Sequence, residues 1–86
     1  MKKNNSKSRL IKINGLVEPH DINDQGKAIS LKLLAQGEEE YIIDGSKTDA
    51  NIWNHIGQII EAHCEVTEGE GGLKVISIND FSVLDT

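Results

Sequence analysis

The chain has 86 residues and a mass of 9.5 kDa, which suffices for one small hydrophobic core and excludes a multi-domain enzyme. It carries 9 basic and 14 acidic residues, for a net charge of −5. Five of the basic residues lie in the first twelve positions, which contain no acid, so the rest of the chain is strongly acidic. The chain has one cysteine and so cannot form an internal disulfide. Nothing in the sequence therefore requires an oxidising compartment, which favours the cytoplasm.

The first nine residues are polar and basic and show no apolar periodicity. This composition is typical of a flexible segment, so we expect a basic arm over residues 1–9 and a single domain over residues 10–86. Lys12 and Asn14 interrupt the apolar run that a signal peptide would need, and no stretch approaches the length of a membrane span. We therefore expect a cytoplasmic protein that does not bind membranes.

The first strand is expected over residues 10–19. Ile11 and Ile13 alternate with polar neighbours until Gly15 interrupts the pattern. A glycine inside a strand commonly marks a bulge or a sharp bend, so we expect the alternation to resume out of phase after Gly15. Pro19 and the polar residues that follow it predict the end of the strand and a turn.

Two further strands are expected over residues 27–34 and 39–44, joined as a hairpin by a short turn. The alternation in the first of these places two sets of side chains on opposite faces. The core face carries Ile29, Leu31 and Leu33, and the outer face carries Ser30, Lys32 and Leu34. The second of these strands is centred on Tyr41, Ile42 and Ile43.

A helix of one or two turns is expected within residues 45–57, where Thr48, Asp49 or Asn51 could cap it and Gly57 supplies the stop. Residues 58–67 form the clearest strand, with a core face of Ile60, Ala62, Cys64 and Val66. A glycine-rich turn leads to the last strand over residues 73–84, which we expect to be bent or bulged near Asn79.

Three strands, a short helix and two strands follow one another in the order of the OB-fold, a five-stranded Greek-key barrel. The sequence resembles small bacterial OB-fold proteins in segments 11–17, 41–44, 52–66 and 75–84. We therefore predict an all-β fold with one short helix between the third and fourth strands. An SH3-like barrel has the same number of strands but accommodates the helical segment less well.

The resemblance implies a module that binds single-stranded nucleic acid or oligosaccharide across the second and third strands and the adjacent loops. Those loops are acidic, however, and are expected to repel phosphate through Asp21, Asp24, Glu68 and Glu70. The three aromatic residues, Tyr41, Trp53 and Phe81, are expected to pack inside the fold rather than to stack with bases.

Our leading hypothesis is therefore a non-catalytic binding module for a protein or a small ligand. Its expected contact residues are Ser30, Lys32, Leu34 and Ile42. The alternative is a single-stranded nucleic-acid-binding protein that uses the basic arm and one side of the barrel. Its expected contact residues are Lys2, Lys3, Lys7, Arg9, Lys12, Lys27 and Lys32.

Neither catalysis nor metal binding is expected. Cys64 and His63 are adjacent in a strand, so their side chains point to opposite faces, and Cys64 is expected to be a buried structural thiol. The three histidines lack the spacing of metal ligands, and the carboxylates lie on surface strands or turns. We therefore expect no enzyme activity, no cofactor and no metal.

Overall fold

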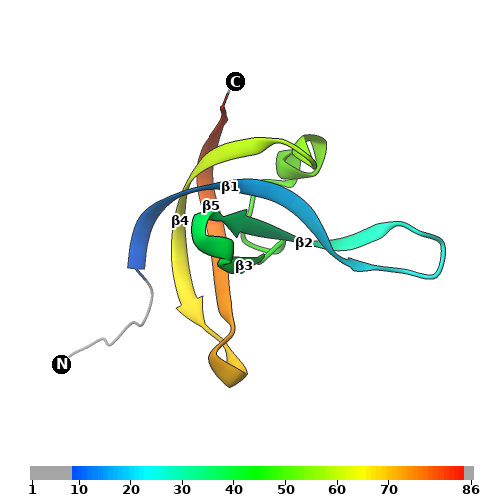
Figure 1. Cartoon of the computed structure of the whole chain (residues 1–86), viewed down its shortest axis with the longest axis horizontal. Coiled ribbons are helices and arrows are strands. Elements are labelled where there is room, and N and C mark those ends of the chain that lie inside the picture. The colour runs from blue at the N-terminus through cyan, green and yellow to red at the C-terminus, as the bar shows by residue number, and fades with distance from the viewer. Residues whose placement is uncertain (1–8, 85–86) are drawn as a thin grey trace.

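Five strands close into a barrel in the order β1-β2-β3-β5-β4, with β4 returning to β1 (Figure 1). They are β1 (Arg9–Ile22), β2 (Ala28–Ala35), β3 (Glu40–Ile43), β4 (Ile59–Glu68) and β5 (Lys74–Val83). Neighbouring strands are antiparallel except for β3 and β5. The prediction of an all-β barrel with five strands is confirmed, and this strand order is compatible with an OB-fold-like barrel.

The computed structural model describes residues 9–84. The predicted basic arm, up to residue 8, lies outside the described residues. Its last expected residue, Arg9, is the first residue of β1.

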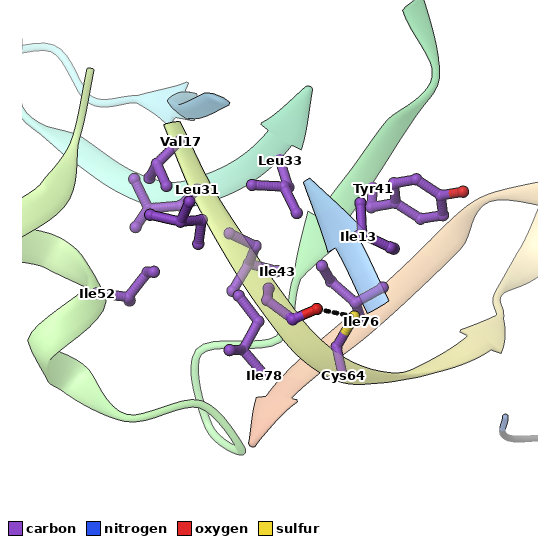
Figure 2. Packing of buried hydrophobic residues seen from close by; sticks show 12 residues of the cluster. Ile13, Val17, Leu31, Leu33, Tyr41, Ile43, Ile52, Cys64, Ile76 and Ile78 are labelled. Atoms are coloured by element: carbon purple, nitrogen blue, oxygen red, sulfur yellow. Dashed lines mark hydrogen bonds between the residues drawn. The ribbon is translucent and has the colours of Figure 1, made fainter. Parts of the chain in front are cut away.

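The connections contain three short 3₁₀ helices, η1 (Gln36–Glu38), η2 (Ala50–His55) and η3 (Glu70–Gly72). The predicted helix between β3 and β4 is η2, and the Asp49 carboxylate caps it by accepting a hydrogen bond from the Asn51 amide at 2.9 Å. Ile52 points from η2 into the core (Figure 2). Trp53, expected to pack inside, is 38% exposed.

The core is formed by alternate residues of all five strands together with Ile52 (Figure 2). The predicted inward faces are correct at Leu31 and Leu33 of β2 and at Ile60, Ala62 and Cys64 of β4. The buried hydrophobic residues among residues 9–84 are Ile13, Val17, Leu31, Leu33, Tyr41, Ile43, Ile52, Ile60, Ala62, Cys64, Ile76 and Ile78.

Gly15 lies where β1 passes from one neighbour to the other. The first half of β1 pairs with β4, the second half pairs with β2, and Gly15 is in register with both. The predicted change of phase is wrong, because Ile13, Gly15 and Val17 all face the core without a register shift. Gly15 is instead a point of close approach, since a Cβ there would lie 2.8 Å from the Leu34 carbonyl oxygen.

The β1–β2 hairpin extends beyond the barrel (Figure 1). β1 continues past Pro19, where we predicted its end, and two register shifts of β1 against β2 lie around His20 and Ile29. Ile29 was predicted to face the core but is 59% exposed. The reason is that β3 pairs with β2 only from Leu31 onward, so Ile29 lies beyond the closed part of the barrel.

The predicted irregularity near Asn79 is a β-bulge. His63 pairs with Asp80 and the next residue, Cys64, pairs with Ile78, so Asn79 is the extra residue in β5. This bulge is therefore confirmed at the predicted position.

We predict that Gly15→Ala will destabilise the barrel by about 1–3 kcal/mol, since the added methyl group would meet both the Leu34 carbonyl and the Leu33 side chain, 2.9 Å away. Urea unfolding followed by circular dichroism would measure the loss. Gly45→Ala is the matched control, because nothing lies within 4 Å of a Cβ at Gly45. Equal stability of the two variants would contradict the close approach at Gly15.

Candidate partner-binding surface

An apolar stripe crosses the outer surface of β4, β1 and β2. Leu16 in β1 is in register with Ile59 on one side and with Leu34 on the other. Each of the three is next in sequence to a fully buried core residue, so each side chain points outward. Ile59 is 43% exposed, and Leu16 and Leu34 are half-buried. The stripe is therefore continuous over three neighbouring strands.

The structure brings together three of the four predicted contact residues. Lys32, Leu34 and Ile42 share the outer face of β2 and β3, with Ile42 directly opposite Lys32. Ser30 lies nearer the hairpin, where its hydroxyl donates to the Asp21 carboxylate at 3.3 Å. We call the apolar residues of this face the outer patch, defined as Leu16, Leu34, Ile42 and Ile59.

Sequence reasoning missed Leu16 and Ile59. The change of phase expected at Gly15 left the outward direction of Leu16 unpredicted. Ile59 was the one apolar residue on the polar face of its strand, so it formed no pattern with its sequence neighbours. The signal that unites them is the pairing of strands distant in sequence, which alternation within one strand does not reveal.

The charge of Lys32 is matched by carboxylates on the neighbouring strands. Its ammonium group lies 3.3 Å from the Glu40 carboxylate, and Glu18 of β1 is in register with it on the other side. Its side chain is only 21% exposed, so its methylene groups are largely covered. The outer patch is therefore apolar around a compensated charge rather than basic.

The described residues of the predicted nucleic-acid site do not form one basic surface. Lys12 lies on the half of β1 that pairs with β4, 3.6 Å from the Glu61 carboxylate. Lys27 lies in the hairpin turn and Lys32 on β2. Lys2, Lys3 and Lys7 lie outside the described residues. Exposed carboxylates lie near the predicted site as well: Asp21 near the end of β1, Asp24 in the turn between β1 and β2, and Glu68 at the end of β4.

The side chains of Tyr41 and Phe81 also lie away from the outer patch. Tyr41 faces the core and donates its hydroxyl to the Glu39 carboxylate at 2.9 Å; burial, and then Glu39, raise the pKa of Tyr41. Phe81 packs edge-on against the His55 ring, with centroids 5.2 Å apart. Neither ring therefore offers a platform for base stacking on the outer face of β2 and β3. The exposed aromatic ring nearest these strands is that of Trp53, which lines a small hollow with Ile29 and Ser30.

His63 and Cys64 point to opposite faces, as predicted. His63 is exposed and pairs with Asp80, its Nδ1 atom 2.8 Å from the carboxylate oxygen. Cys64 has no exposed surface, and burial raises the pKa of its thiol to about 11. Within residues 9–84, no group of three or more histidine, cysteine or acidic side chains is arranged to hold a metal ion.

The hollows of the surface differ in volume and in how open they are to solvent. The hollow next to Ile29 and Trp53 holds about 60 Å³, whereas small-molecule pockets usually hold roughly 300–1,000 Å³. Broader hollows, such as that between His55 and Asp80, are open to solvent. The geometry therefore suits contact across a surface better than enclosure of a ligand.

No protein-family model, curated protein or solved structure matched the chain. Among the described residues, no helix has the length and apolar character needed to cross a membrane.

We predict that Cys64 makes the barrel less stable in alkali. The folded chain holds the thiol proton more tightly than the unfolded chain, because burial raises the pKa from 9.0 to about 11. This contribution is fully present below the unfolded pKa and is lost as the pH rises through the folded pKa, by about 1.4 kcal/mol per pH unit.

Urea unfolding of the wild type and of Cys64→Ala across this pH window would test the effect. The wild type should lose the larger share of its stability, and identical slopes would show that the thiol titrates normally. As a control, the thiol should react with an alkylating reagent only once denaturant is added.

Proposed function

We propose that this chain is a non-catalytic module that binds a protein partner through the outer patch. The observation that carries the proposal is the register of Leu16 with both Ile59 and Leu34, which joins outward apolar side chains of three strands into one surface. Apolar side chains that are partly exposed and contiguous are typical of the centre of a protein interface.

The surroundings of the outer patch support a protein partner. Lys32 and Glu40 form an ion pair between Leu34 and Ile42, which places a compensated pair of charges within the apolar surface. Charged residues of an interface contribute mainly to specificity and to the rate of association. Binding of a small ligand has less support, because the enclosed hollow beside Trp53 is too small to hold most ligands.

The nucleic-acid alternative has less support from the described residues. Lys12 and Lys32 each lie next to a carboxylate, and they occupy different strands of the barrel. Binding of a single strand would need phosphates to approach exposed carboxylates in both adjacent loops, at an electrostatic cost. Binding of an oligonucleotide that weakens steeply with salt would support this alternative.

We predict that Leu34→Asp and Ile42→Asp will each weaken partner binding by at least about tenfold, since a charge buried at the centre of an interface loses hydration without gaining a partner. Leu73→Asp is the matched control, because Leu73 is 49% exposed in the β4–β5 connection and lies outside the outer patch. Proteins retained by the wild type from an extract of the source cells would be identified and purified. Their affinities for the three variants would then be measured by calorimetry.

Retention of full affinity by Leu34→Asp and Ile42→Asp would contradict the proposal. A labelled oligonucleotide would be titrated in parallel at two salt concentrations. Tight binding that weakens steeply with salt would favour the nucleic-acid alternative instead.

A further inference from the structure

The first half of β1 has a neighbour on one side only. Residues Arg9 to Leu16 pair with β4, whereas the pairing with β2 begins at Gly15, opposite Ala35 at the end of β2. Among the described residues, no strand lies along the other edge of β1 between Leu10 and Asn14.

The backbone groups on this edge can be assigned from hydrogen bonds at Val17. The Val17 amide donates to the Gln58 carbonyl, and the Val17 carbonyl accepts from the Gly57 amide, so both groups of Val17 point toward the β4 side. Successive residues of a strand direct these groups to opposite edges. Ile13 therefore bonds to β4, while Lys12 and Asn14 direct their N–H and C=O groups away from it.

β2 has no register partner for Lys12 or Asn14, and neither residue takes part in the turn and loop backbone hydrogen bonds of residues 9–84. An unpaired strand edge is a template for another strand, because its donors and acceptors are already aligned.

This edge forms one wall of a surface hollow of about 400 Å³. The opposite wall is the end of β2, η1 and the start of β3, through Ala35, Gln36, Glu39 and Tyr41. Ile11, Ile13 and the Tyr41 ring supply apolar surface to the hollow, and the Tyr41 hydroxyl points away from the core cluster (Figure 2). We call this hollow the β1 slot.

The wall opposite β1 is acidic. We define its rim as Glu39, which lines the hollow, and its sequence neighbours Glu38 and Glu40; all three are exposed. Lys32 lies 3.3 Å from Glu40 and Lys74 lies 3.7 Å from Glu39, so two lysines accompany three carboxylates. Across the slot, Lys12 is already next to Glu61, at 3.6 Å. Charge complementarity therefore favours a basic occupant.

We propose that the β1 slot binds an extended, basic peptide segment of a partner protein, which adds to β1 as a strand. Its backbone pairs with Lys12 and Asn14. Alternate apolar side chains lie over Ile13 and Tyr41, and the basic side chains between them face the glutamates of the rim. Addition of a strand to a sheet edge obtains affinity from backbone hydrogen bonds and selectivity from alternate side chains. The inference does not depend on the outer patch.

A second copy of the chain is a poorer occupant. Antiparallel pairing of two β1 edges centred on Lys12 would set the two lysines directly opposite each other, which is destabilising.

Amide hydrogen exchange of the full chain, followed by NMR, tests the free edge and its occupant together. In dilute protein the Lys12 and Asn14 amides should exchange rapidly, whereas the Ile11 and Ile13 amides should be protected by β4. The probe is a synthetic peptide in which lysine and valine alternate. Saturation with this peptide should slow exchange at Lys12 and Asn14 by at least about tenfold, since each amide gains a backbone partner.

Two controls isolate the backbone pairing. A peptide in which glutamate and valine alternate should bind at least about tenfold more weakly, because it meets the acidic rim. A lysine–valine peptide with N-methyl groups on the edge that faces β1 should also lose at least about tenfold in affinity, because it lacks the donors.

Asn14→Pro removes the free donor at Asn14 without removing a hydrogen bond to β4, and it should weaken binding of the lysine–valine peptide by at least about tenfold. Asn14→Ala, which keeps the backbone donor, should bind as the wild type does. If Asn14→Pro fails to fold, the N-methylated peptide still tests the same hydrogen bonds on the wild-type chain.

Several results would overturn the proposal. Protection of Lys12 and Asn14 in dilute, peptide-free protein would show that the chain's own residues fill the slot. Protection that grows with protein concentration alone would identify a second copy as the occupant. Equal binding of the N-methylated peptide, absence of binding at millimolar peptide, or binding that perturbs Leu34 and Ile42 instead would each exclude strand addition at β1.

Discussion

The barrel depends on one strand serving two neighbours. β1 pairs with β4 through its first half and with β2 through its second half, and closure requires both ladders to meet at Gly15. At that point the backbone of β1 approaches the Leu34 carbonyl so closely that no Cβ fits between them. Since the core is enclosed by this closure, the absence of a side chain at Gly15 is a condition for burying the isoleucines and leucines of all five strands.

The same crossing creates both candidate binding surfaces. Leu16 follows Gly15 and faces outward between Ile59 and Leu34, so the outer patch is centred on the crossing. Before Gly15, β2 has ended and β1 is left with a free edge toward η1. One geometric requirement, the exchange of neighbours along β1, thus places an apolar surface on one side of Gly15 and an unpaired backbone edge on the other.

Local pattern was enough to predict the strands, the inward faces at Leu33 and Cys64, and the bulge at Asn79, because alternation and turn chemistry act over a few residues. It failed where the outcome depends on distant pairing. Ile29 alternates correctly but lies beyond the closed barrel, and Leu16 joins Ile59 only through the register of β1 with β4. The β1 slot could not be predicted from local pattern either, because it depends on where β2 ends relative to β1.

The arrangement of the strands places several lysines next to glutamates. Lys12, Lys32 and Lys74 each lie within 4 Å of a glutamate on a neighbouring element, so the described lysines mostly offset carboxylates of their own barrel. Exposed pairs of this kind contribute little to stability, but they leave the outer patch almost neutral and the rim of the β1 slot acidic. The two surfaces therefore select by different means. The outer patch would recognise apolar shape and be insensitive to salt, whereas the slot would recognise an extended backbone and be screened by salt.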